Sequence, residues 1–367
     1  MRVGIVGGGQ LGRMLALAGD DLGITCTTLD PAADSPASKV APSIVGAYDD
    51  PDALGALAAG ADVITYEFEN VPVASARLLT SRGVPVFPPP EALDLAQDRL
   101  AEKTLFTEVG LPVPMFAAVG DAASLHDAID AVGLPAVLKT RRLGYDGKGQ
   151  AVLHTAGDAA GAWRAVGEAP SILEALVAFD REVSVLAVRA RDGTTAAWPL
   201  VENIHRDGIL RRSTAPAPGL DPALQAGAER YAAAIMDRLG YVGVLAVELF
   251  VKAGGVLGNE MAPRVHNSGH WTIEGSRTSQ FANHLRAVTG LALGDASMAV
   301  PFASMVNVIG QPPRDAGAVA SVVGATVHLY GKEPRPGRKL GHVTIVADDE
   351  EMLQANVLQV RSMLSDA

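Results

Sequence analysis

Residues 242–271 read VGVLAVELFVKAGGVLGNEMAPRVHNSGHW. Two apolar runs rich in valine and leucine flank the short segment KAGG, a pattern that predicts a β-hairpin. The ten positions after Glu260 hold Arg264, His266, Asn267 and His270. A cation, an amide and two imidazoles so close to a carboxylate indicate an active site in which each group has its own role.

Glu248 and Glu260 are equally distant from Gly254, the expected centre of the hairpin. If the turn is centred there, the two carboxylates face each other with Cβ atoms about 5 Å apart, where like charges repel. A cation between them would remove the repulsion, and such a pair of oxygen ligands suits Mg²⁺ shared with a phosphate. Asn259 is then expected to point to the opposite face. The alternative is two solvated carboxylates around a turn in another register.

The composition fits a compact chain of two or three domains. Of its 367 residues, 48% are hydrophobic and 19% charged, and the net charge of −11 argues against nucleic acid as the main partner. Cys26 is the only cysteine, so an intrachain disulfide is excluded. No 18-residue apolar run occurs, and the chain opens directly on a strand pattern. We therefore expect a soluble, cytoplasmic protein with no membrane partner.

The segment GGGQLG follows a predicted strand and precedes a predicted helix. Gly7, Gly9 and Gly12 fit the pattern G-x-G-x-x-G, and Asp30 ends the next predicted strand 18 residues later. Spacing alone therefore favours an NAD-dependent dehydrogenase. The alternative is a generic first turn of an α/β domain, with glycine used for tight packing or for an anion at the helix N-terminus.

Alternating strand and helix patterns predict a parallel α/β layer over about residues 1–95. Its strands are expected at 2–6, 24–30 and 62–67, and the proline-rich segment 84–90 ends it. Asp98 is the expected N-cap of a helix over 99–110. Beyond it, strands are predicted at 135–140, 171–177 and 182–188, and helices at 124–132, 158–166, 221–240 and 278–290. From about 296 the chain turns strand-rich, and the tail after His342 shows little recognisable pattern.

Two further segments indicate anion binding. In LKTRRLGYDGKGQ (138–150), Lys139 ends a strand before a glycine-rich loop whose N–H groups could cradle phosphates, although a simple hairpin turn is the alternative. In LYGKEPRPGRKLGH (329–342), Lys332, Arg335, Arg338 and Lys339 form a basic segment in an acidic chain. A sugar phosphate would explain it, and a solvated loop is the alternative. The remaining histidines, for which structural or surface roles are expected, are His126, His154, His284 and His328.

Together these motifs resemble a known family. A strand lysine, a glycine loop, EALV, and paired glutamates followed by Asn and Arg form the order of an ATP-grasp ligase. Within that superfamily the chain closely resembles the PurK family, the 5-(carboxyamino)imidazole ribonucleotide synthases of purine biosynthesis. The resemblance spans residues 4 to about 342 and rests on GGGQLGRM, YEFENV, GYDGKGQ, NIHRDGILRRS, GYVGVLAVELF, NEMAPRVHNSGHWT, SQFANHLRA and GRKLGH.

The resemblance implies a reaction and a domain order. ATP would phosphorylate bicarbonate to carboxyphosphate, which then carboxylates the amine of aminoimidazole ribonucleotide, with release of ADP and phosphate. It implies Mg²⁺, no NAD, and a homodimer. The implied parts are an N-terminal parallel α/β (pre-ATP-grasp) domain over 1–98, an ATP-grasp domain over 99–295 with a lid over 115–177, and a small strand-rich C-terminal domain over 296–367.

Residue roles are carried over from matching positions. Arg99 and Lys139 would contact phosphates below the closing loop 144–150, and Glu248 and Glu260 would hold the metal beside Asn259. The residues implied for the nucleotide and its metal are Arg99, Lys139, Gly144, Tyr145, Asp146, Gly147, Lys148, Gly149, Gln150, Glu174, Ala175, Leu176, Val177, Glu182, His205, Glu248, Asn259 and Glu260. Within this set, residues 174–177 would hold the adenine edge, Glu182 the ribose, and His205 would line the site.

The acceptor side is implied in the same way. The residues that would bind the ribonucleotide, the last three through its 5′-phosphate, are Gln10, Leu11, Glu67, Lys332, Arg338 and Lys339. The residues that would hold bicarbonate, carboxyphosphate and the amine are Arg264, His266, Asn267, Tyr145 and Asp146, with Asn267 also touching the ribonucleotide. Either His266 or Asp146 could take the proton of the amine.

One departure and three alternatives accompany this interpretation. The family loop often reads Gly-Gly-Tyr-Asp-Gly, whereas Leu143 stands at the first glycine here; this would stiffen the lid and leave its contacts intact. A formate-dependent glycinamide ribonucleotide transformylase would carry Asp where Asn267 stands. A dehydrogenase would leave the glutamate pair and GYDGKGQ unexplained. A non-catalytic nucleotide-binding module is disfavoured because the catalytic set is complete.

Overall fold

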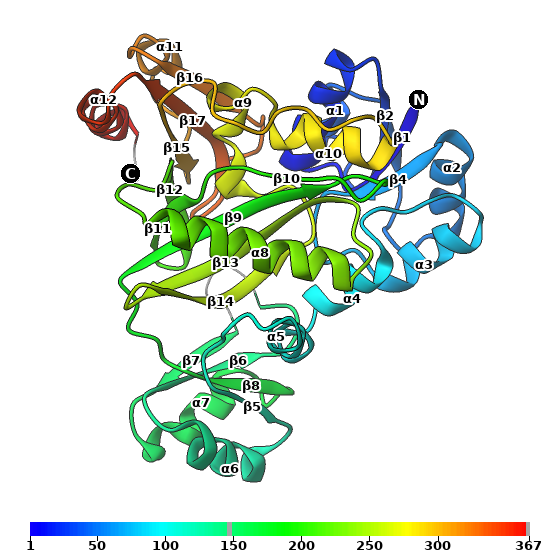
Figure 1. Cartoon of the computed structure of the whole chain (residues 1–367). Helices are drawn as coiled ribbons and strands as arrows, with labels where there is room; N and C mark the ends of the chain where they lie inside the picture. The colour runs from blue at the N-terminus through cyan, green and yellow to red at the C-terminus, as the bar shows by residue number, and fades with distance from the viewer. Residues whose placement is uncertain (145–148, 365–367) are drawn as a thin grey trace.

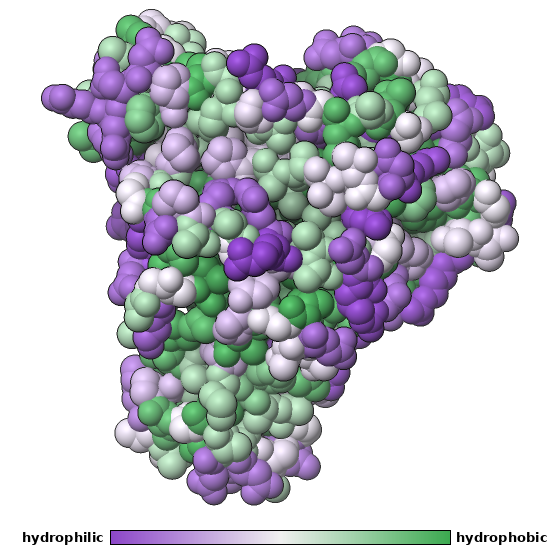
Figure 2. All heavy atoms as spheres, viewed as in Figure 1, coloured by the Kyte–Doolittle hydropathy of each residue, from purple (hydrophilic) through white to green (hydrophobic). Residues whose placement is uncertain are grey.

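The computed structural model describes residues 1–144 and 149–364. They form three sheets, which Figure 1 shows as a blue N-terminal layer, a long central sheet and a cyan-green lobe that projects below it. The lobe also stands out in Figure 2, where hydrophilic and hydrophobic residues are interspersed over the face viewed. None of the helices in the described part of the chain is long and apolar enough to cross a membrane.

The N-terminal layer is a parallel four-stranded sheet in the order β3-β2-β1-β4, as the alternating pattern predicts. The segment 84–90 adds only a bridge between Ile64 and Val86. The elements are β1 (Arg2–Val6), α1 (Gln10–Asp21), β2 (Thr25–Asp30), η1 (Ala37–Lys39), β3 (Ser43–Val45), α2 (Pro51–Gly60), β4 (Val63–Tyr66), α3 (Val73–Ser81) and α4 (Pro90–Ala96).

Helix α5 (Arg99–Glu108) connects this layer to the projecting lobe. Asp98 caps it by accepting a hydrogen bond from the Leu100 N–H at 3.1 Å, which confirms the expected N-cap. The lobe is an antiparallel sheet in the order β5-β8-β6-β7, covered by two helices. Its elements are β5 (Phe116–Val119), α6 (Ala122–Val132), β6 (Ala136–Thr140), β7 (Gln150–Leu153), η2 (Ala156–Asp158), α7 (Ala159–Ala165) and β8 (Ser171–Ala175).

The central sheet runs in the order β14-β13-β9-β11-β12-β15-β17-β16, with β10 also paired to β9. The C-terminal strands therefore continue the central sheet. The elements are β9 (Arg181–Arg189), β10 (Thr195–Ala197), β11 (Val201–Arg206), β12 (Ile209–Ala215), α8 (Pro222–Arg238), β13 (Gly243–Lys252), β14 (Gly255–Ala262), η3 (Asn267–Gly269), α9 (Thr272–Gly275), α10 (Gln280–Thr289), β15 (Phe302–Ile309), α11 (Ala316–Ala320), β16 (Ala325–Leu329), β17 (Lys339–Ala347) and α12 (Glu350–Met363).

A shared apolar core joins the N-terminal layer to the central sheet. Leu15 of α1, Leu285 of α10 and Val244 of β13 belong to one buried cluster, and Figure 1 shows α1 beside α10. Each fully buried leucine contributes about 2 kcal/mol to folding. This packing places the N-terminus of α1 and the end of β14 around the same space.

His284 crosses this boundary with both ring nitrogens bonded. Its Nδ1 accepts from the Val244 N–H at 3.1 Å, so Nε2 carries the proton and donates to the Thr65 hydroxyl at 2.8 Å. Burial lowers the pKa of His284 to about 3. A proton on Nδ1 would face the Val244 N–H, so two donors would meet and this hydrogen bond would be lost. The folded chain therefore requires the neutral ring.

This requirement predicts acid lability. The pKa of His284 is lower in the folded chain than its ordinary value of 6.5, so the unfolded chain binds the extra proton as the pH falls below 6.5. Between pH 7.5 and 5.5 His284 alone should remove about 1.4 kcal/mol from the free energy of unfolding. Urea titrations of wild type and His284→Gln at both pH values measure this. The variant should lose that part of the pH dependence, whereas the exposed-site control His126→Gln should keep it.

Candidate active site

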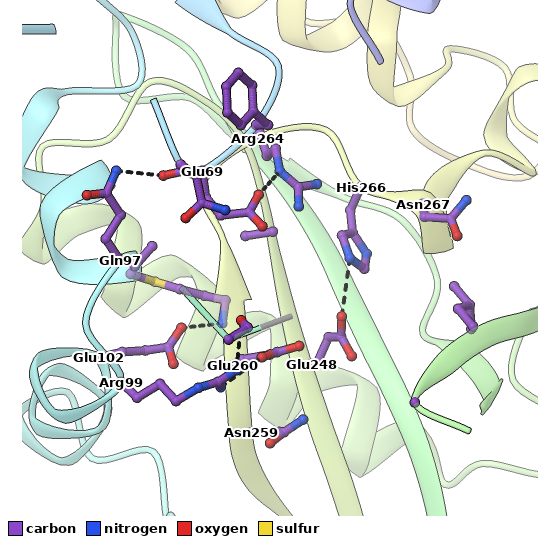
Figure 3. Close-up of a pocket in the computed structure, with 18 of the residues that line it drawn as sticks. Glu69, Gln97, Arg99, Glu102, Glu248, Asn259, Glu260, Arg264, His266 and Asn267 are labelled. Carbon is purple, nitrogen blue, oxygen red and sulfur yellow. Dashed lines mark hydrogen bonds and ion pairs between the residues drawn. The ribbon is translucent and has the colours of Figure 1, made fainter. Parts of the chain in front are cut away.

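A cavity of about 600 Å³ lies where the N-terminal layer, the lobe and the central sheet meet. Figure 3 shows side chains from the loop after β4, from α5 and the residue Gln97 before it, from the hairpin and from the segment after the hairpin around this space. The expected site residues that line it are Gln10, Leu11, Glu67, Arg99, Lys139, Gly144, Gln150, Glu182, His205, Glu248, Asn259, Glu260, Arg264, His266, Asn267 and Lys339. Segments far apart in the sequence therefore converge on one cavity.

The hairpin brings Glu248 directly opposite Glu260, as expected, but by a different route. Its turn holds only Ala253 and Gly254, both at positive φ, so it is centred between them and not on Gly254. A β-bulge at Asn259 adds one residue to β14 and restores the opposition. The expectation that Asn259 points to the opposite face is wrong, because Asn259 lines the same cavity as both glutamates.

Cations lie beside both carboxylates. His266 Nδ1 lies 2.9 Å from the Ser268 hydroxyl, and its Nε2 lies 3.2 Å from Glu248, where the protonated ring forms an ion pair with that carboxylate. Burial opposes ionisation of Glu248, yet the hydrogen bond and charge of His266 lower the pKa of that carboxyl to about 2. Arg99 lies 3.2 Å from Glu260. Figure 3 shows both contacts.

Arg264 is held at the rim nearest the N-terminal layer. Its guanidinium contacts the Glu69 carboxylate and donates to the Val265 carbonyl at 2.9 Å. Burial opposes ionisation of Glu69, but the charge of Arg264 holds the pKa of that carboxyl below its usual value. Gln97 fixes the loop by donating to the Glu69 carbonyl at 2.7 Å. The motif YEFENV contains Glu69, but its spacing gave no signal that this glutamate would meet Arg264.

Asn267 and His270, the other polar side chains expected in the segment after the hairpin, have different surroundings. Asn267 lines the cavity and exchanges reciprocal side-chain hydrogen bonds with Asn307 of β15, at 3.1 and 2.7 Å. His270 is buried away from the cavity, with its ring 4.7 Å from that of His342. His342 also stacks on His328 at 4.4 Å. His270 is therefore a core residue and not part of the site.

The glycine-rich segment 138–150 connects two antiparallel strands of the lobe, β6 and β7. Lys139 pairs with Gln150 across β6 and β7, and Arg99 donates to the Gly144 carbonyl at 3.3 Å. Leu143 has φ 64°, a conformation that glycine adopts without strain. Tyr145, Asp146, Gly147 and Lys148 lie outside the described residues. Gly149, at φ 70°, closes the hairpin.

The glutamate of the segment EALV is paired with two lysines in the structure. Glu174 is 2% exposed, and its carboxylate lies 3.1 Å from Lys139 and 3.4 Å from Lys103. Burial opposes its charge, but the two lysines hold its pKa below the usual value. Glu174 and the three residues after it, Ala175, Leu176 and Val177, are absent from the described lining of the cavity. Glu174 therefore fixes Lys139 at the edge of the cavity.

Another wall of the cavity holds a glutamate–histidine pair and two stacked phenylalanine rings. His205 Nδ1 lies 2.5 Å from Glu182. Burial lowers the pKa of His205, but Glu182 and Glu248 outweigh it and raise that pKa above its ordinary value. Phe179 and Phe250 stack beside them at 4.7 Å and also line the cavity. Sequence reasoning missed both aromatic residues, because Phe250 reads as one apolar residue of a strand.

The glycine turn GGGQLG is occupied by the chain itself. Glu67 accepts from the N–H groups of Gly9 at 2.5 Å and Gly12 at 2.6 Å, at the N-terminus of α1. Asp30 accepts from Gly8 N–H and the Tyr48 hydroxyl, both at 2.8 Å. The N–H groups of the glycine turn and the Asp30 carboxylate, which would bind a dinucleotide, are hydrogen-bonded within the protein. This arrangement removes the support that spacing gave to an NAD site.

The basic segment 329–342 adjoins this turn. Lys332 contacts the Gln10 side chain, and Lys339 lines the cavity. Burial lowers the pKa of Lys332 to about 8, against the charge of Glu67. Arg338 instead donates to the Glu333 carbonyl at 3.0 Å. Neither Lys332 nor Arg338 belongs to the cavity lining among the described residues, although Lys332 reaches it through Gln10.

Comparison with known families defines the class of protein. The chain matches a ribonucleotide synthetase pre-ATP-grasp domain over residues 1–97, an ATP-grasp domain over 104–281 and a phosphoribosylaminoimidazole carboxylase C-terminal domain over 303–356. These matches agree with a nucleotide-dependent ligase built on the ATP-grasp fold, the class that the cavity and its flanking carboxylates indicate.

Individual relatives are more specific. An N5-carboxyaminoimidazole ribonucleotide synthase from Pseudomonas aeruginosa is 50% identical over 99% of both chains. The crystal structure of the synthetase from Thermus thermophilus is 51% identical and superposes with a TM-score of 0.95 over 100% of this chain and 99% of that one. A second structure, from Aspergillus clavatus with ADP and 5-aminoimidazole ribonucleotide, is 29% identical with a TM-score of 0.92, covering 99% of this chain and 98% of that one. The chain belongs to the N5-carboxyaminoimidazole ribonucleotide synthase (PurK) family.

The glycine turn yields a steric prediction. A Cβ added at Gly9 would lie 2.3 Å from Glu67 Oε1, so Gly9→Ala must displace the buried carboxylate. We expect a loss of about 1–3 kcal/mol in the free energy of unfolding, measured by urea titration. Gly60→Ala is the matched control, because a Cβ there meets nothing within 4 Å. Equal stability of the two variants would contradict this role of Glu67.

Proposed function

We propose that the cavity in Figure 3 carries out the reaction of this family, the ATP- and bicarbonate-dependent carboxylation of 5-aminoimidazole ribonucleotide through carboxyphosphate. The observation that carries the proposal is the opposed pair Glu248 and Glu260, with Arg99 and His266 beside it. Opposed carboxylates flanked by cations suit phosphoryl transfer, in which positioning and charge stabilisation do most of the work.

The nucleotide is proposed to lie between the lobe and the central sheet. Lys139 and Arg99 supply positive charge for its phosphates, and Glu182 with His205 offers polar partners for the ribose. Phe179 and Phe250 provide an apolar surface beside them. Residues 174–177 remain proposed for the adenine edge through their backbone, and loop 144–150, with Tyr145, Asp146, Gly147 and Lys148, for closure over the phosphates. Closure matters because carboxyphosphate hydrolyses readily unless water is excluded.

Mg²⁺ is proposed at Glu248 and Glu260, with the Asn259 amide beside them. The donor set fits, since all three side chains line the cavity and offer oxygen ligands. Within residues 1–144 and 149–364 no three His, Cys, Asp or Glu side chains form a metal-binding group. Phosphate oxygens would therefore complete the shell, and Mg²⁺ so held neutralises charge on the transferring phosphoryl group.

The acceptor is proposed to lie beneath Arg264. Arg264, His266 and Asn267 face the space beside Glu248 and would hold bicarbonate, carboxyphosphate and the amine. Both ring nitrogens of His266 are engaged, so this ring is better placed to orient Glu248 than to take the proton of the amine. The ribonucleotide itself would lie against Gln10, Leu11 and Glu67. Its 5′-phosphate is assigned to Lys332, Arg338 and Lys339.

The first test is ADP release from Mg²⁺-ATP with and without each co-substrate. Strong stimulation by 5-aminoimidazole ribonucleotide, lost when bicarbonate is removed, is the expected result. Stimulation by formate with glycinamide ribonucleotide instead would favour the related transformylase. On the family resemblance alone we also propose a homodimer and a cytoplasmic location. Sedimentation velocity of the same purified protein tests the homodimer.

Removing one of the two carboxylates proposed to bind Mg²⁺ should slow turnover strongly. We expect Glu260→Gln to lower kcat on the order of 100-fold or more and to raise the Mg²⁺ concentration for half-maximal rate, because an amide is a weaker ligand than a carboxylate. Steady-state rates over a Mg²⁺ series measure both effects. Glu202→Gln, on a strand outside the cavity lining, is the control for loss of one carboxylate. An unchanged Mg²⁺ requirement in Glu260→Gln would contradict the metal assignment.

The phosphate assignment predicts a selective binding defect. Lys332→Met removes an ammonium beside Gln10, and a lost charged hydrogen bond costs about 1.5–3 kcal/mol. KM for the ribonucleotide should therefore rise about tenfold or more, with KM for ATP unchanged. Lys252→Met, at the exposed end of the hairpin, controls for loss of one positive charge. A rise in KM for ATP alone would overturn this assignment.

A further inference from the structure

Two adjacent residues of α5 contact the backbone on both sides of the bulge in β14. Glu102 accepts a hydrogen bond from the Met261 N–H at 2.7 Å. Lys103 donates to the carbonyls of Gly258 at 3.0 Å and Asn259 at 2.6 Å. Figure 3 shows Glu102 directed at the strand beside Glu260.

The location explains why such contacts are needed. β14 is the last strand of the central sheet, so its outer side has no neighbouring strand to pair with. The bulge also takes one residue out of the ladder with β13. Glu102 and Lys103 are 2% and 1% exposed, so the groups they bond lie away from water. Without these side chains, two carbonyls and one N–H would lose their partners in a dry environment.

We propose that Glu102 and Lys103 form a positioning clasp that maintains the bulge, so that Asn259 and Glu260 both face the cavity. Without the bulge, alternation along a regular strand would turn neighbouring side chains to opposite faces. Neither residue is a proposed ligand; each acts through the backbone of the residues that are. The inference rests on the proposed metal role of Glu260 and adds the groups that orient it.

Lys103 also connects the clasp to the projecting lobe. Its ammonium lies 3.4 Å from Glu174 of β8, and the same carboxylate lies 3.1 Å from Lys139. The buried ammonium of Lys103 thus connects β14 to Glu174, and through Glu174 to Lys139. Loss of Lys103 should therefore affect the Mg²⁺-nucleotide side of the cavity and leave the ribonucleotide side intact.

The test compares variants that keep or remove the clasp. Lys103→Met and Glu102→Leu retain apolar bulk but lose the hydrogen bonds. Each should raise the Mg²⁺ concentration for half-maximal rate by about tenfold or more, the range found when groups supporting metal ligands are removed. KM for the ribonucleotide should change less than about twofold. Glu102→Gln keeps an oxygen that can accept from Met261 and should rescue the wild-type Mg²⁺ requirement.

Thr104→Val is the matched control on the same helix. Thr104 is exposed, and its hydroxyl donates to the Leu100 carbonyl of its own helix at 2.7 Å. Its Mg²⁺ requirement should equal that of wild type. If Lys103→Met or Glu102→Leu does not fold, Glu102→Asp is decisive, because its shorter side chain should leave the Met261 N–H and raise the Mg²⁺ requirement, unlike Glu102→Gln.

Two outcomes would overturn the clasp. One is an unchanged Mg²⁺ requirement in folded Lys103→Met, Glu102→Leu and Glu102→Asp. The other is an equal loss on the Mg²⁺ and ribonucleotide sides, which a purely structural role would produce. Glu260→Gln separates this failure from that of the metal site. If Glu260→Gln raises the Mg²⁺ requirement and the clasp variants do not, only the clasp is wrong.

Discussion

The repulsion between Glu248 and Glu260 is the constraint around which the site is arranged. Two carboxylates directly opposed on a hairpin destabilise it unless positive charge lies near both. The chain supplies that charge from two directions, with His266 from the segment after the hairpin and Arg99 from the start of α5. These contacts hold the loop, the helix and the hairpin together around one cavity. The paired charges that suit a Mg²⁺-nucleotide thus also hold together the walls of the cavity.

Much of the fold follows from local pattern. The parallel N-terminal sheet, the Asp98 cap and the hairpin all depend on periodicity, turn chemistry and capping, which act over a few residues. The opposition of Glu248 and Glu260 was also predictable, but only because two errors cancelled: the turn is shorter than expected and the bulge adds a residue. A bulge has no reliable local signature, since it depends on what satisfies the freed backbone groups, here Glu102 and Lys103 of another element.

The missed features share a physical origin in tertiary partners. Glu69 orients Arg264, which lies 195 residues later in the chain. His270, which the sequence placed in the site, is instead buried against His342. Helix α12 is a different case. Asp349 caps it, acids occupy its first turn, and the buried Leu353, Val357 and Val360 follow helical spacing, so its pattern was present in the sequence and overlooked. The segments that line the cavity were predictable from residue type, whereas the groups that orient them required the structure.

The glycine turn shows how one local motif can serve two purposes. A helix N-terminus preceded by glycines exposes N–H groups that attract an anion, and dinucleotide-binding proteins fill it with a pyrophosphate. Here Glu67 supplies the anion from within the chain, and the lack of Cβ atoms at Gly7 and Gly9 is what lets its side chain approach. The same internal bonds fix Gln10 and Leu11 at the edge of the cavity, where the ribonucleotide is proposed to bind. A motif that spacing assigns to a dinucleotide therefore positions cavity-lining residues instead, and the identity of the bound anion separates the two uses.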